Sequence, residues 1–163
     1  MNRPLTFTLL WLLLIAGSLP ARADTLTGLV IAVTDGDTLR VLDAQQQQHR
    51  VRLYGIDAPE SHQAFGNRSR QYLASLAFRQ NVTVTYSEKD RYGRILGTVF
   101  RGRQNLNLEM VRAGLAWHYV YFAKNETDLA KAEKDARKKQ LGLWADKNPI
   151  PPWYFRRLPK NGN

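Results

Sequence analysis

Apolar and polar residues alternate along much of the chain with the two-residue period of β-strands, whose successive side chains point to opposite faces. The alternating runs are bounded by residues that favour turns. They lie at 49–56, at 81–88, at 95–100 and at 28–43, where a tight turn at Asp35-Gly36 separates two runs. The pattern therefore predicts five strands, arranged along the chain as a group of three followed by a group of two.

Three other segments place apolar residues at the three- and four-residue spacing of helices. They are 67–79, 105–114 and 127–142. In the second of them, Asn105 and Gly114 are typical start and stop residues. The aromatic segment 117–122 is predicted to be extended. The proline-rich tail, about 148–163, is predicted to be non-helical and to lie along the surface, since proline lacks the amide hydrogen that a helix interior needs.

The order of these elements predicts the fold class α+β. Helices are inserted after the third and the fifth strands rather than after every strand, so regular crossover connections between parallel strands are missing. We therefore expect a small five-stranded antiparallel barrel with about three helices. One domain covering residues 24–163 is long enough to bury a hydrophobic core.

Residues 1–23 have the layout of a secretory signal peptide. An early cation precedes the apolar run from Leu5 to Leu19, and Ala-Arg-Ala at 21–23 resembles a cleavage site. The alternative is an uncleaved membrane anchor, although the run is short for a membrane span. Cleavage near Ala23 would export the mature chain to the periplasm or to the outside of the cell. That chain has no second hydrophobic stretch, so it is not expected to be embedded in a membrane.

The charge of the chain favours polyanionic partners. The formal net charge is +10, and it falls to +8 once Arg3 and Arg22 leave with the signal peptide. Nucleic acid, anionic lipid and acidic polysaccharide all fit this charge, which cannot choose among them. The chain has no cysteine, which excludes disulfides and lipid attachment through an N-terminal cysteine. Nothing indicates a stable protein partner, and a monomer is the default expectation.

Four acidic side chains are the first candidates for chemistry in this basic chain. They are Asp35 and Asp37 in the sequence DGDT, and Asp57 and Glu60 in the sequence RLYGIDAPE. Carboxylates from separate loops can converge on a hard cation such as calcium. Each segment also has an ordinary explanation, because Asp-Gly forms hairpin turns and acidic residues complement the start of a helix. The ordinary explanations weaken if both segments lie together with arginines nearby.

Arginines are the second set of candidates, because guanidinium groups bind phosphate in bidentate fashion and remain charged. Arg50 and Arg52 lie on the same face of one predicted strand, so alternation does not choose between them. Arg91 and Arg94 flank the turn at Tyr92-Gly93.

Four motifs occur in a recognisable order: DGDT, RLYGIDAPE, DRYGR and NLEMVRAGLAWHY. In this order and spacing the chain resembles the thermonuclease family, the staphylococcal-nuclease-like enzymes built on an oligonucleotide-binding (OB) barrel. The resemblance extends from about Gly28 to Trp144 and implies an OB fold. It also implies a calcium-dependent endonuclease that hydrolyses phosphodiester bonds in DNA and RNA.

The resemblance also implies roles for individual residues. Asp37 and Asp57 match the calcium ligands, with the backbone carbonyl of Ala58 as a further ligand, and Asp35 matches an acid beside the metal. Glu60 matches the general base, and Arg52 and Arg94 match the phosphate-binding arginines. Tyr92 aligns with a nucleotide-binding tyrosine, and Tyr119 and Tyr121 align with others if a one-residue gap is allowed.

Two other classes of function remain as alternatives. Barrels of this type also serve as nucleic-acid-binding modules without catalysis. A cationic envelope protein that contacts anionic lipid would explain the charge but not the motifs. Substitution of Glu60 by glutamine separates these classes, because only a nuclease would lose cleavage while keeping its fold and its binding to DNA.

Overall fold

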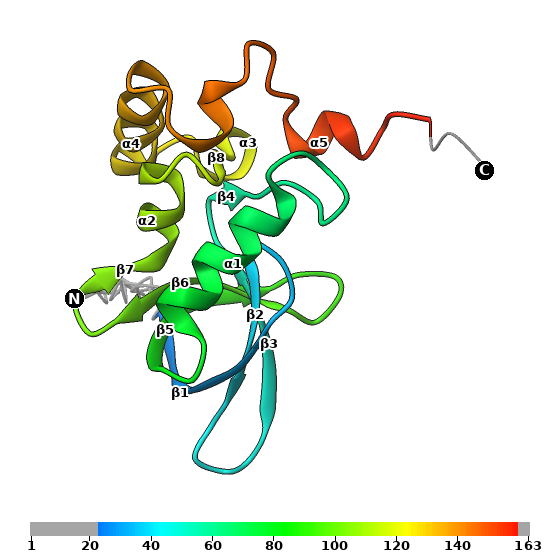
Figure 1. Cartoon of the computed structure of the whole chain (residues 1–163). Coiled ribbons are helices and arrows are strands. Elements are labelled where there is room, and N and C mark those ends of the chain that lie inside the picture. The colour runs from blue at the N-terminus through cyan, green and yellow to red at the C-terminus, as the bar shows by residue number, and fades with distance from the viewer. Residues whose placement is uncertain (1–22, 160–163) are drawn as a thin grey trace, which may run out of the picture.

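Five strands close into a barrel in the computed structural model, which describes residues 23–159 (Figure 1). The strands are β1 (Asp24–Val33), β2 (Thr38–Leu42), β3 (Gln48–Leu53), β5 (Asn81–Lys89) and β6 (Ile95–Arg101). Neighbours in the order β3-β2-β1-β5-β6 pair antiparallel, and a parallel pairing of β3 with β6 closes the barrel. The five-stranded barrel is confirmed, and the structure adds that its closing pair is parallel.

The first strand holds the two halves of the barrel together. Its first part, Asp24–Leu29, pairs with β5, and its second part, Leu29–Val33, pairs with β2. A register shift between Val30 and Ala32 bends the strand where it changes partners. The interior is filled by alternating side chains that are almost completely buried, among them Val30, Leu39, Val41, Val51, Leu53, Val84 and Val99.

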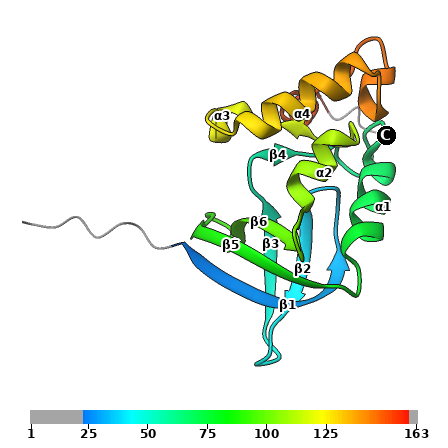
Figure 2. The ribbon, with the colours of Figure 1, turned by 90° about the vertical axis from the view of Figure 1, so that its left-hand side faces the viewer.

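The three predicted helices are present, each somewhat shorter than its sequence pattern. They are α1 (Gly66–Ala77), α2 (Leu106–Arg112) and α4 (Thr127–Lys138), and a 3-10 turn, η1 (Gly142–Ala145), follows α4. Asn105 caps α2, since its side chain accepts a hydrogen bond from the amide of Leu108 at 3.1 Å. In Figure 2, α1 stands beside the barrel while α2 and α4 lie across one end of it.

The predicted extended segment 117–122 is only partly extended. Strand β8 (Trp117–His118) pairs with the equally short β4 (Ile56–Asp57), and one helical turn, α3 (Val120–Ala123), follows. The ladder ends because β4 offers only two residues. The chain then turns, with the ring of buried His118 hydrogen-bonded to the carbonyl of Ala123 at 2.8 Å.

The prediction that the tail is non-helical is wrong for four residues, because Pro152–Phe155 form the helical turn α5. Proline is compatible with this turn because Pro152 is its first residue, where no intrahelical amide donor is needed. One further short strand, β7 (Gln104–Asn105), pairs with the end of β6.

The predicted signal peptide lies outside the described residues, apart from Ala23. Among residues 23–159, no helix has the length and apolar character that crossing a membrane requires.

Asn107 ties the barrel to the segments above it. Its side chain is 2% exposed; the amide donates to the carbonyls of Tyr54 (2.8 Å) and Gly97 (3.2 Å), and the oxygen accepts from the amide of Val99 (3.0 Å). One side chain therefore bonds backbone groups of β6 and of the segment after β3, which also pair directly through the Tyr54 amide and the Gly97 carbonyl at 2.8 Å.

We predict that Asn107→Ala lowers the free energy of unfolding by about 3 kcal/mol, because it leaves buried backbone groups without partners. Urea unfolding followed by tryptophan fluorescence measures the loss. Asn125→Ala, at an exposed asparagine, is the matched control and should change stability by less than about 0.5 kcal/mol. Equal effects of the two substitutions would contradict the role assigned to Asn107.

Candidate active site

Strand register brings the DGDT turn and the RLYGIDAPE segment together at one end of the barrel. Thr38 at the start of β2 lies opposite Arg52 of β3, and the amide of Leu53 donates to the carbonyl of Asp37 at 2.8 Å. After the two residues Tyr54 and Gly55 the chain enters β4, which carries Asp57. The turn and the segment are thus linked by backbone pairing, so their side chains meet without a long connection.

Asp37 is held on both of its carboxylate oxygens. Oδ1 accepts from the hydroxyl of Thr38 at 3.0 Å, and Oδ2 accepts from the amide of Ala58 at 2.7 Å. The side chain is almost buried, at 6% exposed. The hydrogen bond from Ala58 fixes the backbone beside Asp57 against the DGDT turn. Ala58, whose carbonyl is a predicted ligand, therefore lies next to Asp37.

Arg52 lies between the two buried aspartates. Its Nη2 donates to Asp57 Oδ1 at 2.9 Å, and its Nη1 forms an ion pair with Asp37 Oδ2 at 2.5 Å without an aligned hydrogen bond. Arg50, by contrast, is exposed and donates to the carbonyl of Tyr92 at 2.7 Å. The structure therefore separates two arginines that alternation along the strand could not distinguish.

Asp35 lies next to this pair on the turn. Its Oδ1 accepts from the amide of Asp37 at 3.0 Å. Burial, with the neighbouring charge of Asp37 as the next cause, raises the pKa of Asp35 to about 7. Gly36, between the two acids, touches α1: a Cβ there would lie 1.9 Å from Ser69 Oγ, so only glycine allows this close approach.

Glu60 is positioned by the loop that leads into α1. Its amide donates to the side chain of Gln63 at 3.1 Å, and its carbonyl lies so close to Gly66 that a Cβ there would be 1.9 Å away. Gln63 also donates to the carbonyl of Ile150 at 2.6 Å, which links the Glu60 loop to the C-terminal segment. The Glu60 side chain is about one third exposed, at 32%.

One arginine that sequence reasoning missed binds both Asp57 and Glu60. Arg156, directly after α5, places Nη1 2.8 Å from Glu60 Oε1 and Nη2 2.9 Å from Asp57 Oδ2. Burial raises the pKa of the Asp57 carboxyl, and the hydrogen bonds from Arg156 and the charge of Arg52 act in the opposite direction. Asp57 is 1% exposed, so these two guanidinium groups supply the positive charge that its burial demands.

In the DRYGR turn the arginine pairs with the aspartate of the same turn. Arg94 donates through Nε to Asp90 Oδ2 at 2.7 Å, and Asp90 Oδ1 accepts from the amides of Tyr92 and Arg94, each at 2.9 Å. The ring of Tyr92 is exposed, with the guanidinium of Arg91 4.9 Å from its centre. The structure thus brings Arg52, Asp37, Asp57, Asp35 and Glu60 together and leaves Arg94 paired on its own turn.

Aromatic side chains gather around the segment that follows β8, the strand paired with the Asp57 strand β4. Tyr119 stacks on Trp153 of α5, with ring centres 5.2 Å apart and planes 13° from parallel. Tyr121 lies 6.4 Å from Tyr119 and is 82% exposed. The two predicted nucleotide-binding tyrosines are therefore neighbours, and Tyr119 is partly covered by the C-terminal segment.

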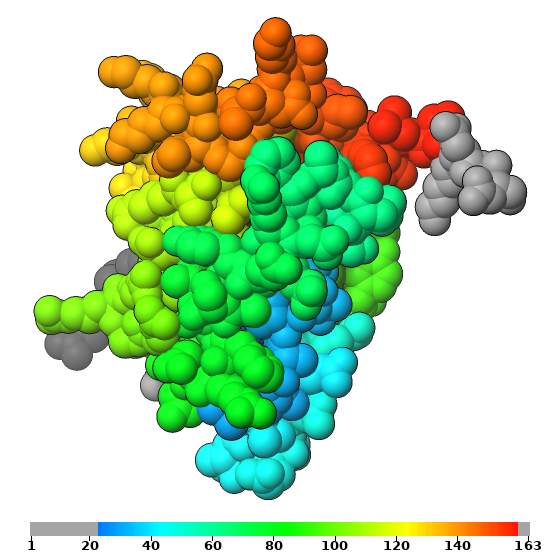
Figure 3. Space-filling model, in the orientation of Figure 1, coloured from blue at the N-terminus to red at the C-terminus, as the bar shows by residue number. Residues whose placement is uncertain are grey.

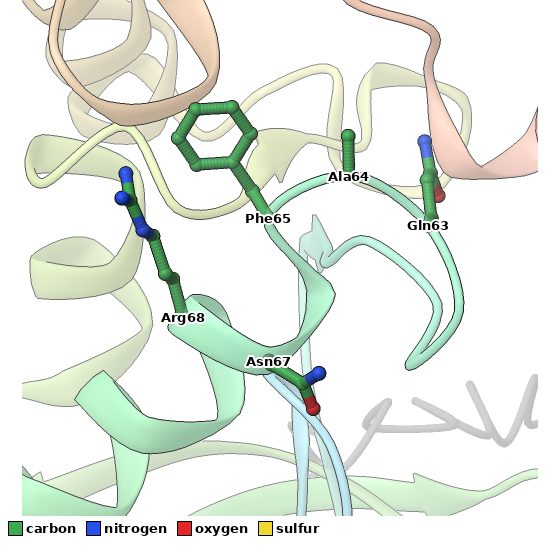
Figure 4. A pocket seen from close by; sticks show the side chains of 5 residues that line it. All are labelled: Gln63, Ala64, Phe65, Asn67 and Arg68. Atoms are coloured by element: carbon green, nitrogen blue, oxygen red, sulfur yellow. The ribbon is translucent and has the colours of Figure 1, made fainter.

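A surface pocket of about 340 Å³ lies beside the carboxylates rather than among them. It is lined by the loop before α1 and by the first turn of that helix (Figure 4). In this view, Gln63 faces the C-terminal ribbon, and Phe65 points away from it toward the helices above. The pocket contains none of the acidic or basic residues predicted from the motifs.

The acidic groups fit a hard cation by their chemistry. Among residues 23–159, no cluster of three or more acidic, histidine or cysteine side chains has the grouping of a metal site. The predicted ligand set, however, has only two carboxylates together with a backbone carbonyl. Beyond the effect of burial, the charge of Asp37 raises the pKa of both Asp35 and Asp57, so the acids repel one another and a bound cation would relieve that repulsion.

Comparison of the sequence with known proteins shows to which class of protein this barrel, with its carboxylate–arginine cluster, belongs. The model of the family described as staphylococcal nuclease homologue matches residues 50–146. A relative from Shigella flexneri named micrococcal nuclease is 49% identical, over 88% of this chain and 87% of its own length. Relatives named uncharacterized endonuclease come from Haemophilus influenzae and Escherichia coli; each is 42% identical, over 98% and 89% of this chain and 88% and 94% of their own lengths.

The chain therefore belongs to the staphylococcal nuclease homologue family. The resemblance seen in the motifs is confirmed, and so is the enzyme class, a nuclease. The predicted roles of individual residues stay predictions.

We predict that Arg52→Ala destabilises the protein by about 3 kcal/mol in the presence of a chelator, because it leaves Asp37 and Asp57 buried with too little opposing charge. Arg50→Ala removes the same charge from the same strand and should cost less than about 1 kcal/mol. Urea unfolding of both variants measures the difference. Similar losses would mean that the ion pairs of Arg52 do not stabilise the fold.

Proposed function

We propose that the protein is an exported, calcium-dependent endonuclease that hydrolyses phosphodiester bonds in DNA and RNA. The observation that carries this proposal is the placement of two almost fully buried aspartates, Asp37 and Asp57, around Arg52, with Glu60 joined to the same cluster through Arg156. Burying carboxylates carries a desolvation penalty, and clusters of such groups are typical of functional sites, here one that would bind a cation and a phosphate.

Asp37, Asp57 and the backbone carbonyl of Ala58 would hold the ion, with Asp35 beside them. All of these groups offer oxygen, which is what calcium prefers. When bound, calcium would help neutralise the charge that develops on the phosphate during hydrolysis. The hydrogen bond from the Ala58 amide to Asp37, 2.7 Å long, keeps the two metal-binding segments in register.

Arg52 and Arg94 would bind the phosphate from two directions. Arg52 is fixed by its ion pairs, so it offers donors that need little reorganisation when charge develops. Arg94 is held by Asp90 at 2.7 Å, and binding a phosphate would require it to exchange that carboxylate for the substrate. Tyr92, Tyr119 and Tyr121 would stack against the bases or sugars that flank the phosphate.

Glu60 would act as the general base. It would accept a proton from the attacking water at a carboxylate oxygen, a contribution of about 10²–10⁴-fold for such groups. Its partial exposure supports this role, because a water molecule must reach it. The exposed positive charge of the protein would gather the polyanionic substrate.

The relatives support the substrate class. One is named a micrococcal nuclease and two are named endonucleases. Non-catalytic binding by the same barrel is the outcome that would replace this proposal.

We predict that Glu60→Gln lowers plasmid cleavage by about 10²–10⁴-fold while leaving DNA binding intact. Cleavage by the wild-type protein should need calcium and stop when a chelator is added. Glu88→Gln, at an exposed glutamate of β5, is the matched control and should cleave like the wild type. Binding without cleavage in every condition would instead assign the chain to the nucleic-acid-binding modules.

Export is part of the same proposal and has its own test. We predict that the protein recovered from outside the cytoplasm begins at Asp24, because the small residues at 21 and 23 set the cleavage site. Intact mass measurement and N-terminal sequencing decide this. A chain that keeps residues 1–23 and sediments with membranes would show an uncleaved anchor.

A further inference from the structure

A guanidinium group from the C-terminal segment occupies the carboxylates assigned to the ion and to the base. Arg156 Nη2 donates to Asp57 Oδ2 at 2.9 Å, and its Nη1 donates to Glu60 Oε1 at 2.8 Å and to Asp57 Oδ1 at 3.2 Å. Asp57 Oδ1 also accepts from Arg52 at 2.9 Å. Both oxygens of Asp57 therefore accept hydrogen bonds from arginine, and Arg156 also forms the ion pair with Glu60.

The helical turn that carries Arg156 is anchored by contacts that do not involve the carboxylates. Trp153 stacks on Tyr119, and the Gln63 side chain donates to the carbonyl of Ile150 at 2.6 Å. The rings of Phe155 and His62 lie 5.1 Å apart. Figure 3 shows the C-terminal segment, in red, packed against the green loop that leads into α1. These contacts keep the arginine close to the site even when its own ion pairs break.

The two arginines at Asp57 differ in how easily they can leave. The Arg52 side chain is 14% exposed and lies on β3, paired with Asp37 and Asp57, whereas that of Arg156 is 43% exposed and follows a single helical turn. Removing Arg156 from the carboxylates requires only a side-chain rotation into solvent. A cation bound to the same oxygens would lie beside a guanidinium of like charge, so the two occupants exclude each other.

We propose that Arg156 is a built-in competitor for the cation: it occupies Asp57 and Glu60 in the free enzyme and must leave both carboxylates before the ion binds. This inference rests on the proposed function, which assigns Asp57 to the ion and Glu60 to the base. It makes Arg156 a positioning residue that keeps the two acids paired until the ion arrives. It also means that Glu60 becomes free to act as a base in the same event that loads the site.

The size of the effect follows from the fraction of molecules in which Arg156 is away from the site. The apparent dissociation constant for the ion equals the intrinsic one divided by that fraction. An arginine that occupies the site about nine tenths of the time weakens binding about tenfold. Because α5 is anchored, the arginine competes from a fixed local position, and its competition does not depend on the protein concentration.

The test is calorimetric titration of the purified protein with calcium alone, without nucleic acid, so the readout is binding rather than cleavage. Arg156→Ala should bind calcium about tenfold more tightly than the wild type. Arg157→Ala is the matched control: it removes the same charge from the next residue, for which the structure shows no ion pair with any described side chain. Its affinity should match that of the wild type.

Arg156→Lys gives a second measurement in a variant that keeps the charge. Lysine cannot engage Asp57 and Glu60 with one planar fork, so its calcium affinity should lie between those of the wild type and Arg156→Ala. Equal affinities in the wild type and Arg156→Ala, or equal gains in Arg156→Ala and Arg157→Ala, would overturn the competition. Weaker binding in Arg156→Ala would do so as well.

The same titrations distinguish a failure of the proposed function from a failure of the competition. If no variant binds calcium, the assignment of the ion to Asp37 and Asp57 is wrong, and the competition is wrong with it. If the wild type and all variants bind calcium with one affinity, the assignment of the ion stands and only the role of Arg156 is lost. Binding that is detectable only in Arg156→Ala would support the competition most strongly.

Discussion

The ion pairs of Arg52 with Asp37 and Asp57 are the constraint on which the rest of the site depends. Two carboxylates that are 6% and 1% exposed remain charged only where opposite charge and hydrogen bonds replace water. Thr38, the amide of Ala58 and the guanidinium groups supply those partners. The register of β2 with β3 brings the DGDT turn and the RLYGIDAPE segment to one end of the barrel, and the hydrogen bond from the Ala58 amide to Asp37 holds them together.

Much of this arrangement was predictable because it is local in the sequence. Alternation gave the five strands, and Asn105 marked the start of α2 correctly. The motifs placed Asp37, Arg52, Asp57 and Glu60 in one site, and the structure brings them together. The choice of Arg52 over Arg50 needed either the family resemblance or the structure, because both side chains lie on the same strand face and differ only in their partners.

What the sequence could not predict depends on contacts between distant segments. Arg156 lies 99 residues beyond Asp57, in a tail whose prolines indicated irregular structure. Nothing in the run of basic residues that follows Phe155 separates Arg156 from Arg157. Pro152 is compatible with the first position of the helical turn α5, but the stacking of Trp153 on Tyr119, which packs the turn against the domain, has no local pattern. Segment 117–122 also depends on a distant contact, because its extended part ends where its pairing partner β4 ends.

The C-terminal segment changes how the site should be understood. Without Arg156, Asp57 would keep only Arg52 as a guanidinium partner and Glu60 would lose its ion pair, and the charge of Asp37 already raises the pKa of Asp57. A basic tail residue solves this problem in the free protein by the same means that a cation would use, which is positive charge at hydrogen-bonding distance. Buried carboxylates need positive charge nearby, and a basic side chain can substitute for a cation in supplying it. In this fold the substitute is the more exposed of the two arginines, anchored through its neighbours and not through the carboxylates that it covers.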